Sequence, residues 1–459
     1  MTPNTRRGLP AAAACALLAA CMHTPPAAPL EPAATLARFN ARTLPGLSGG
    51  LPAASAGWDR SQWLSAALQL NPQLGEQRAA VLAAAAAERS AAEHPNPGVE
   101  LFAEYLTASA QSTAWLYGVS LDFLLRRPAE RARARQQAAL QAALAQSELA
   151  ESIWQVRAAL RQALLDAVSA RDETALLEAL IAERQALVDS DRARVQLGDL
   201  ARTQMLADEL ELARARQRRQ QSRTRAADAV ARLAAAVGVP STALASASVR
   251  WDDWAAIGAL QSASSERWRT EALIGRPQIT HALREYDLSQ LSLQREVARR
   301  WPQLHITPAY AWGGDGIRED ARGALDTESA LGVSFELPLF NRHRGPIAEA
   351  LARRTAAGEH LKAVQAQIFE QIERAERAWP AVREAWQETG ELAALAERRS
   401  NAEERALREG ASDRAGVLAS RIAATEARLA VLAAAYTAEV AYGALEDAYH
   451  RPLEGDEAQ

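Results

Sequence analysis

The sequence is poor in the residues that mark enzymes, metal centres and nucleic-acid binders. Only two of its 459 residues are cysteine, and its seven histidines are scattered, without CxxC, HExxH or another ligand-spaced cluster. We therefore expect no metal site and no cofactor. No GxGxxG, P-loop or GxSxG motif stands between a strand and a helix, so no catalytic residue and no enzyme are predicted. The net charge of -4 lacks the basic excess of a nucleic-acid partner.

Long apolar runs are also scarce, and the one near the N-terminus, Leu9–Ala20, is too short to span a bilayer. It follows a positive start at Arg6 and suits a signal peptide over residues 1–20. The run ends in Leu-Ala-Ala-Cys21, which resembles a bacterial lipobox, so Cys21 is the predicted lipidation site. Met22 in place of aspartate favours, by resemblance to lipoproteins, the outer membrane. A plain signal peptide with an incidental cysteine is the alternative.

The rest of the chain is duplicated. Short segments recur in the same order at offsets of about 205, 214 and 212 residues. The matching pairs are Ala67–Leu74 with Ala272–Ile279, Pro97 with Pro302, Tyr105 with Tyr310, Gly118–Asp122 with Gly332–Glu336, Gly198 with Gly410, Leu233 with Leu445 and Pro240 with Pro452. Each copy covers roughly 180 residues, far beyond the 20–50 of a solenoid repeat, so whole domains are duplicated.

This duplication predicts the domain organisation. Each repeat is expected to hold a helix, two strands and a long helical hairpin. The predicted segments are a lipoprotein-type signal peptide at 1–20, an N-terminal linker at 21–60, repeat 1 at 61–240, a linker or equatorial segment at 241–265, repeat 2 at 266–453 and a tail at 454–459.

Aromatic residues make up only 5% of the chain, and alanine, leucine, arginine, glutamate and glutamine dominate, as is typical of long helices. We expect first helices at about 60–95 and 268–300, strands at 98–106, 115–125, 304–312 and 329–339, long helices at 127–195 and 342–408, and return helices of roughly 38 residues. A long helix of about 69 residues runs roughly 100 Å. The first and return helices together have nearly that length, so they are predicted to stack end to end beside it. For the helices alone, a structural coiled coil is the alternative.

The predicted strands alternate strictly between apolar and polar residues. They have the length of tilted strands in a membrane barrel, and aromatic residues flank their connecting loops. These aromatics are Tyr105, Trp115, Tyr117, Tyr310 and Trp312. A half-buried strand pair in a soluble α+β domain is the alternative. Four strands cannot close a barrel, since the smallest use 8, so two chains would supply eight strands or three would supply twelve. Only the larger barrel leaves a useful lumen.

The polar side of the strands carries acidic residues. These are Glu100, Glu104, Asp122 and Glu336. In a barrel they would face the lumen and favour cations by Coulomb attraction. An equally good explanation is that these acidic residues only keep a solvent-exposed face soluble.

In order and twice over, these segments resemble the TolC-like outer-membrane efflux protein family, from about Leu64 to Leu453. The motifs are Asn71-Pro72, Arg276-Pro277, Pro302 with Ala309-Tyr310, Gly198 with Met205-Leu206, Gly410 with Val417-Leu418, and Ala444-Leu445 with Arg451-Pro452-Leu453. The stretch 337–345 looks like the subgroup that serves heavy-metal (cobalt–zinc–cadmium type) resistance pumps.

The resemblance implies a mainly α fold with a small β part. Long antiparallel helical hairpins would form a periplasmic tunnel, below a 12-stranded transmembrane β-barrel to which each chain of a homotrimer gives four strands. It also implies a lipid-anchored protein of the cell outer membrane that extends into the periplasm. Its partners would be a periplasmic adaptor protein, an inner-membrane resistance–nodulation–division pump and outer-membrane lipid.

By the same resemblance, the hairpin tips dock the adaptor. The docking positions carried over are Leu197, Gly198, Asp199, Glu409, Gly410 and Ala411. The family's acidic gate does not carry over, because its positions are Gly416 and Ala419 here. Ion pairs between hairpins, of Asp199 with Arg202 or Asp413 with Arg414, are a candidate gate, and solvated tip charges are the alternative.

The expected function is therefore a passive exit duct for metal cations or small toxic compounds, driven by the partner pump. A periplasmic lipoprotein scaffold of coiled-coil type is the alternative from another class. A duct for drugs or proteins rather than metals is a third hypothesis.

Overall fold

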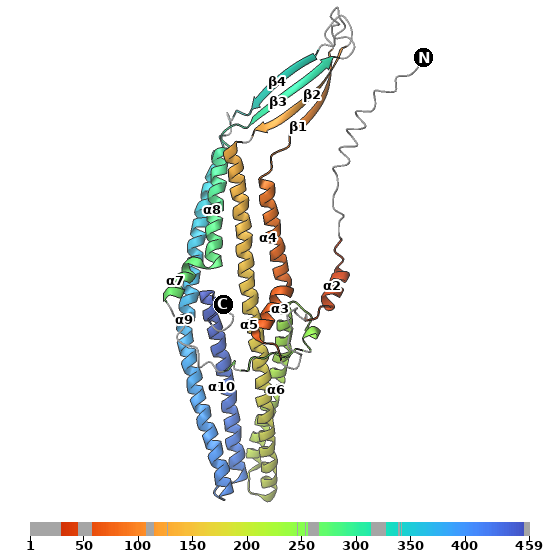
Figure 1. Ribbon diagram of the computed structural model, residues 1–459. Coiled ribbons are helices and arrows are strands. Elements are labelled where there is room, and N and C mark those ends of the chain that lie inside the picture. The colour runs from red at the N-terminus through yellow and green to blue at the C-terminus, as the bar shows by residue number, and fades with distance from the viewer. Residues whose placement is uncertain are drawn as a thin grey trace, which may run out of the picture.

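The computed structural model describes residues 29–44, 57–106, 114–125, 127–245, 247–252, 254–255, 266–313, 327–337, 340 and 342–453. The elements are α2 (Pro32–Asn40), α3 (Arg60–Leu70), α4 (Pro72–Ala91), β1 (Gly98–Leu106), β2 (Ala114–Leu125), α5 (Pro128–Leu197), α6 (Arg202–Val237), η2 (Ser241–Leu244), α7 (Glu266–Gly275), α8 (Pro277–Ala298), β3 (Leu304–Gly313), β4 (Thr327–Phe335), α9 (Arg344–Arg408) and α10 (Arg414–Tyr449). Long helices run side by side along an elongated molecule, and a four-stranded sheet stands at one end (Figure 1). The predicted signal peptide, Cys21 and the tail lie outside the described residues.

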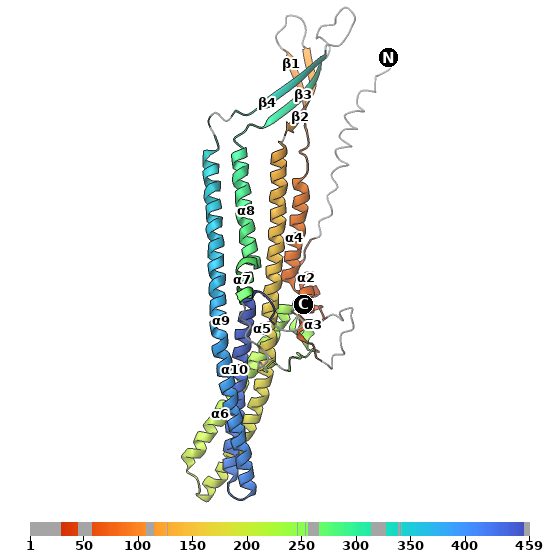
Figure 2. The same ribbon diagram turned by 60° about the vertical axis from the view of Figure 1, so that its left-hand side comes forward.

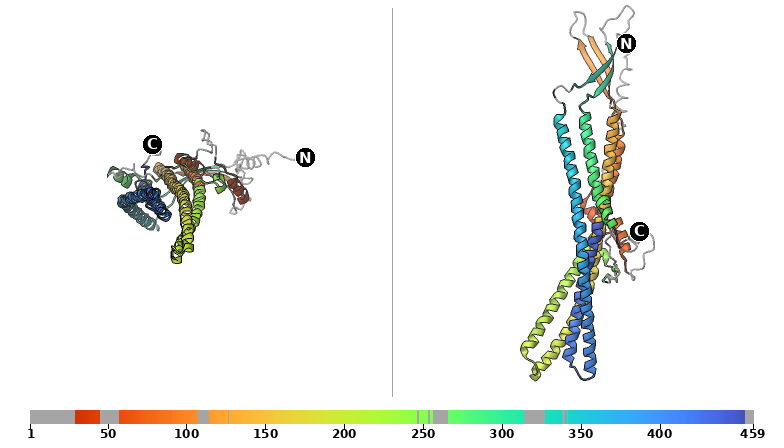
Figure 3. Two further views of the ribbon diagram at one scale, coloured as in Figure 1. Left: turned by 90° about the horizontal axis from the view of Figure 1, so that it is seen from below. Right: turned by 90° about the vertical axis from the view of Figure 1, so that its left-hand side faces the viewer.

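Two shorter helices line each long helix, as the lengths predicted. α4 and α6 both pack on the 70-residue α5, which is about 105 Å long, while α8 and α10 both pack on α9. α5 also contacts α8 and α10, so it joins the two repeats into one curved helical wall (Figure 2). The α5–α6 and α9–α10 hairpins diverge toward their tips (Figure 3). None of the described helices is long and apolar enough to cross a bilayer.

The expectation of one uninterrupted first helix is wrong in both repeats. α3 ends at Leu70 and α4 begins at Pro72; α7 and α8 are divided in the same way before Pro277. The proline ring forces the preceding residue out of the helical region. Asn71 accordingly has ψ 121° and Arg276 has ψ 146°. Each break lets the short helix pack on both a long helix and its return helix.

The four strands form one antiparallel sheet in the order β1-β2-β3-β4. β2 pairs with β3, so the central ladder joins the two repeats. Strand bounds match the prediction to within one residue except in β4, which begins at Thr327 instead of 329 and ends at Phe335 instead of 339. β1 and β4 are the edges, and no helix of the described part covers either face (Figures 1 and 2).

The main core lies at mid-height, where α3 and α10 meet α5. Trp63 is fully buried there, in the same hydrophobic cluster as Val168 and Leu164 of α5. Trp254, from the segment predicted only as a linker or equatorial piece, is 2% exposed and donates a hydrogen bond to Asp172 Oδ2 at 2.8 Å. The described parts of that segment therefore pack against the helical wall at mid-height.

Candidate functional site: sheet, repeat junction and hairpin tips

One face of the sheet is apolar and open to the surroundings. Register places Val99 opposite Leu121 and Leu101 opposite Val119, so their side chains share one face. Exposed fractions reach 78% for Leu101 and 71% for Leu331 on edge strand β4. A monomeric soluble protein rarely exposes so continuous an apolar surface, which therefore marks an interaction surface.

The opposite face is polar and carries three of the four predicted lumen acids. Glu100 and Glu104 of β1 and Asp122 of β2 lie on this face, because they alternate along their strands with the residues of the apolar face. Glu336 does not join them, because β4 ends one residue before it. Sequence reasoning missed His305, whose Nδ1 lies 3.1 Å from Asp122 Oδ1. A histidine therefore lies beside one of the predicted lumen acids on the polar face.

The aromatic residues that flank the loops gather at the end of the sheet far from the helices. Tyr105 and Trp115 pack edge to face with ring centroids 5.0 Å apart, and Trp115 stacks on Tyr117 at 6.2 Å. Tyr310 and Trp312 of β3 pack at 6.1 Å. Aromatic clusters of this kind suit the boundary between hydrocarbon and water.

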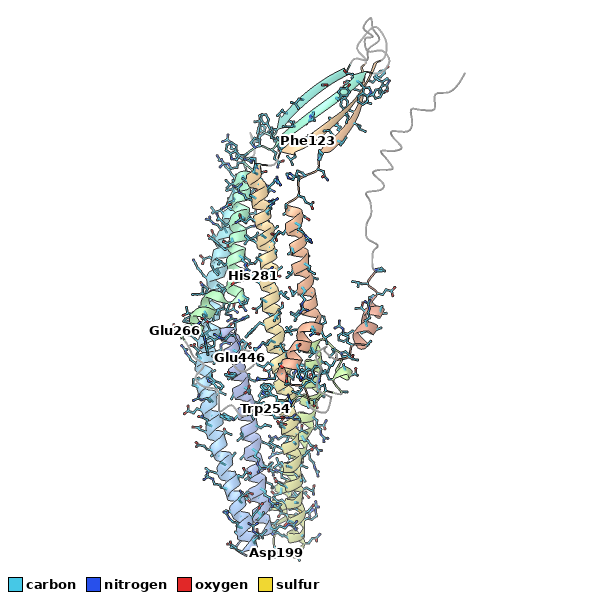
Figure 4. The ribbon with its side chains drawn as sticks, viewed as in Figure 1. Phe123, Asp199, Trp254, Glu266, His281 and Glu446 are labelled. Carbon is cyan, nitrogen blue, oxygen red and sulfur yellow. The ribbon has the colours of Figure 1, made fainter. Side chains whose placement is uncertain are left out.

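The hairpin tips lie at the opposite end of the molecule, where Figure 4 labels Asp199. Gly198 (φ 80°) and Gly410 (φ 74°) adopt the left-handed conformation that glycine favours at a helix end. In the first tip the Asp199 amide donates to Arg194 O at 2.9 Å, and in the second the Ala411 amide donates to Ala406 O at 2.8 Å. The six predicted docking residues are all exposed.

The candidate gate residues make few contacts within one chain. Asp413 caps α10 by accepting a hydrogen bond from the Gly416 amide at 2.7 Å. In the described part of the chain, neither Arg202 nor Arg414 forms an ion pair. Pairing between hairpins of neighbouring chains stays a prediction.

A buried carboxyl group lies below the first tip. Asp191 of α5 is 3% exposed, and its Oδ1 lies 3.7 Å from Arg194 Nη1. Burial raises the pKa of Asp191, and hydrogen bonding to and repulsion from Asp208 of α6 raise it further. The folded hairpin therefore favours the protonated form of Asp191 more than the unfolded chain does.

Replacing Asp191 with asparagine is expected to raise the free energy of unfolding at pH 7, whereas most substitutions lower it by about 1 kcal/mol. A raised folded-state pKa means that stability is highest below the unfolded value of 3.8 and falls as pH rises through the folded value. The gain should vanish below pH 3.8. Thermal unfolding across pH measures it. The control Asp189→Asn removes an exposed carboxylate and should give no gain; a destabilised D191N would contradict the prediction.

A buried ion-pair cluster joins the two repeats at mid-height, near the labelled Glu446 (Figure 4). Arg161 of α5 donates to Glu446 Oε2 and to Asp447 Oδ2 of α10, each at 2.6 Å, and to Gly443 O at 3.0 Å. Arg157 lies 3.3 Å from the same Glu446 oxygen. Trp154 donates to Asp447 Oδ1 at 3.1 Å. This repeat junction cluster fixes where α10 lies on α5.

No group of three or more histidine, cysteine or acidic side chains within the described ranges could hold a metal ion.

No family model and no curated protein matches the sequence. Solved structures do match the fold. The outer membrane protein VceC from Vibrio cholerae has a TM-score of 0.67 at 16% identity, over 86% of this chain and 97% of that one. CusC, described as forming a transmembrane channel, has a TM-score of 0.68 at 14% identity, over 93% of this chain and 98% of that one. The open MtrE outer membrane channel from Neisseria gonorrhoeae has a TM-score of 0.65 at 16% identity, over 87% of this chain and 91% of that one.

At these identities the comparisons establish the fold. The chain is mainly helical with a small antiparallel sheet, and it has the fold of outer-membrane channel proteins. This is the fold that the resemblance to the TolC-like family implies. The neighbours do not single out a heavy-metal subgroup.

Proposed function

We propose that this protein is the outer-membrane channel component of a tripartite efflux system, a passive exit duct that catalyses no bond change. The observation that carries the proposal is the sheet, which exposes one apolar face and ends in two unpaired edge strands, β1 and β4. Such an edge in hydrocarbon leaves backbone groups unpaired, so neighbouring copies must close the sheet into a barrel.

Three copies satisfy this requirement with a 12-stranded barrel and a usable lumen. The helical wall offers matching edges for the same assembly. α6 exposes Leu206 (50%) and Leu210 (52%), while α9, at the other edge, exposes Leu392 (65%) and Leu395 (54%). Burying these leucines between copies would extend the wall into a closed periplasmic tunnel.

The proposed arrangement places the sheet in outer-membrane lipid, with the chain anchored through lipidated Cys21, and the tips deep in the periplasm. Leu197, Gly198 and Asp199, with Glu409, Gly410 and Ala411, are then available to a periplasmic adaptor, and an inner-membrane resistance–nodulation–division pump supplies the energy. Metal cations or small toxic compounds are the proposed cargo. Cation preference would come from Glu100, Glu104 and Asp122, with Glu336 at the lower rim of the barrel.

Purified protein in planar bilayers is expected to conduct ions with a preference for cations. Weakening the proposed gate with Asp413→Ala and Arg414→Ala should raise the open fraction. Cross-linking should give trimers. If neither the wild type nor this variant conducts ions, and the protein is monomeric, the lipoprotein scaffold is favoured instead. Sensitivity of a deletion strain to metal salts, set against sensitivity to drugs, identifies the cargo.

A further inference from the structure

A cavity of about 710 Å³ lies where the helical wall meets the sheet. The ends of α5 and α8 form most of it, together with residues just after β4. Five arginines line it, against two glutamates: Arg131, Arg133, Arg295, Arg299 and Arg300, with Glu130 and Glu336. This excess of positive charge makes the junction cavity attractive to anions.

Several of these arginines keep unused hydrogen-bonding capacity. Arg131 Nε is buried and has no hydrogen-bond partner among the residues that the structure describes. Neither Arg133 nor Arg300 forms an ion pair within the described ranges. Arg299 is neutralised by Glu296 at 2.8 Å, and Arg295 is occupied by a hydrogen bond to Gln137. A buried donor without a partner is costly, so the cavity is prepared for an acceptor from outside the chain.

The rim of the junction cavity is apolar and exposed. Trp301 is 67% exposed, Leu337 is 62% exposed, and Phe340 is fully exposed at 102%. Leu337 follows Phe335 by two residues, and Phe335 pairs with Leu304 on the apolar face of the sheet. An apolar track therefore leads from the arginines onto the sheet.

We infer that the junction cavity binds the phosphate of an anionic glycerophospholipid. This inference rests on the proposed function, which places the cavity at the periplasmic surface of the outer membrane. Arginines suit a phosphate diester, because the guanidinium fork donates two parallel hydrogen bonds to its oxygens. The acyl chains then lie along Leu337, Phe335 and Leu304, and Trp301 sits at headgroup level. A free anion would use only the arginines and leave the apolar rim uncovered, so the lipid is the better fit.

Native mass spectrometry of the full-length assembly tests this with phosphatidylglycerol and phosphatidylethanolamine as probes. The wild type should bind phosphatidylglycerol more tightly. The variant Arg133→Ala with Arg300→Ala should lose about tenfold or more of that affinity, since each arginine contributes on the order of 1 kcal/mol to anionic-lipid binding. The matched control is Arg405→Ala with Arg408→Ala, which likewise removes two arginines, both of them exposed, at the far end of α9.

Three results would overturn the inference: equal binding of the two lipids by the wild type, an equal loss in the control variant, or full displacement of phosphatidylglycerol by inorganic phosphate, which would identify a soluble-anion site. Planar-bilayer conductance of the same preparations separates this from the proposed function. Conducting protein without lipid preference contradicts only the lipid site, whereas protein that never conducts contradicts the channel.

Discussion

Replacing Arg161 with alanine is expected to lower the free energy of unfolding by about 3–5 kcal/mol, the usual result of removing one partner from a buried ion pair. The Arg161 side chain is 18% exposed and that of Glu446 only 5%. Without the guanidinium, Glu446 and Asp447 repel each other, and Arg157 is the one cationic side chain still within ion-pair distance of Glu446 among the described residues. Denaturation followed by circular dichroism in detergent measures the loss.

The control is Arg223→Ala, which breaks an ion pair with Glu178 whose two side chains are each 51% exposed. It should cost about 1 kcal/mol or less. Gly443→Ala probes the cluster without removing a charge, because an added Cβ would lie 2.7 Å from Arg161 Nε. The loss of unfolding free energy in this variant should lie between the losses in R161A and R223A. An R161A variant no less stable than R223A would show that the repeat junction does not depend on this cluster.

The repeat junction explains how a duplicated chain becomes one continuous wall. Each repeat supplies a long helix with its two short partners, and α5 contacts α8 and α10 of the second repeat as well as α4 and α6 of its own. The β2–β3 ladder makes the same connection in the sheet. Charges at mid-height and backbone hydrogen bonds above therefore hold the halves in register.

Local patterns were enough to predict most of this fold. Strict alternation gave β1 and β2 to within one residue, and Gly198 and Gly410 marked the hairpin turns because left-handed helix ends favour glycine. The helix lengths predicted which helices stack. These features depend on neighbours within a few residues.

Features that depend on distant partners were not predictable in the same way. Arg161 and Glu446 are 285 residues apart, and nothing local distinguishes this arginine from the many that are solvated. His305 meets Asp122 only through the β2–β3 register. The helix break at Asn71 did have a local signal in Pro72, but the alanine-rich pattern on its C-terminal side outweighed it. Candidate site residues at the tips stay predictions, because the partners proposed for them are other chains.

Placing arginine at Leu101 or Leu331 is expected to prevent stable membrane insertion. These residues lie near the middle of β1 and β4, on the apolar face, and are 78% and 71% exposed. An arginine facing the bilayer midplane costs about 2–4 kcal/mol per chain. In a soluble scaffold the same substitution at so exposed a position would change stability by only about 0.5 kcal/mol. The two functions thus predict opposite results for one change.

Glu104→Arg is the matched control, because it places the same side chain on the polar face of β1. This variant should insert and form trimers, with its cation preference reduced. Protection of the strands from added protease in isolated membranes, which does not depend on the anchor at Cys21, followed by cross-linking, measures insertion and assembly together. If L101R and L331R insert as well as E104R does, the apolar face does not contact lipid, and the barrel must be abandoned in favour of the scaffold. If only the apolar-face variants fail, the difference between the two faces of a single strand assigns one to hydrocarbon and the other to water.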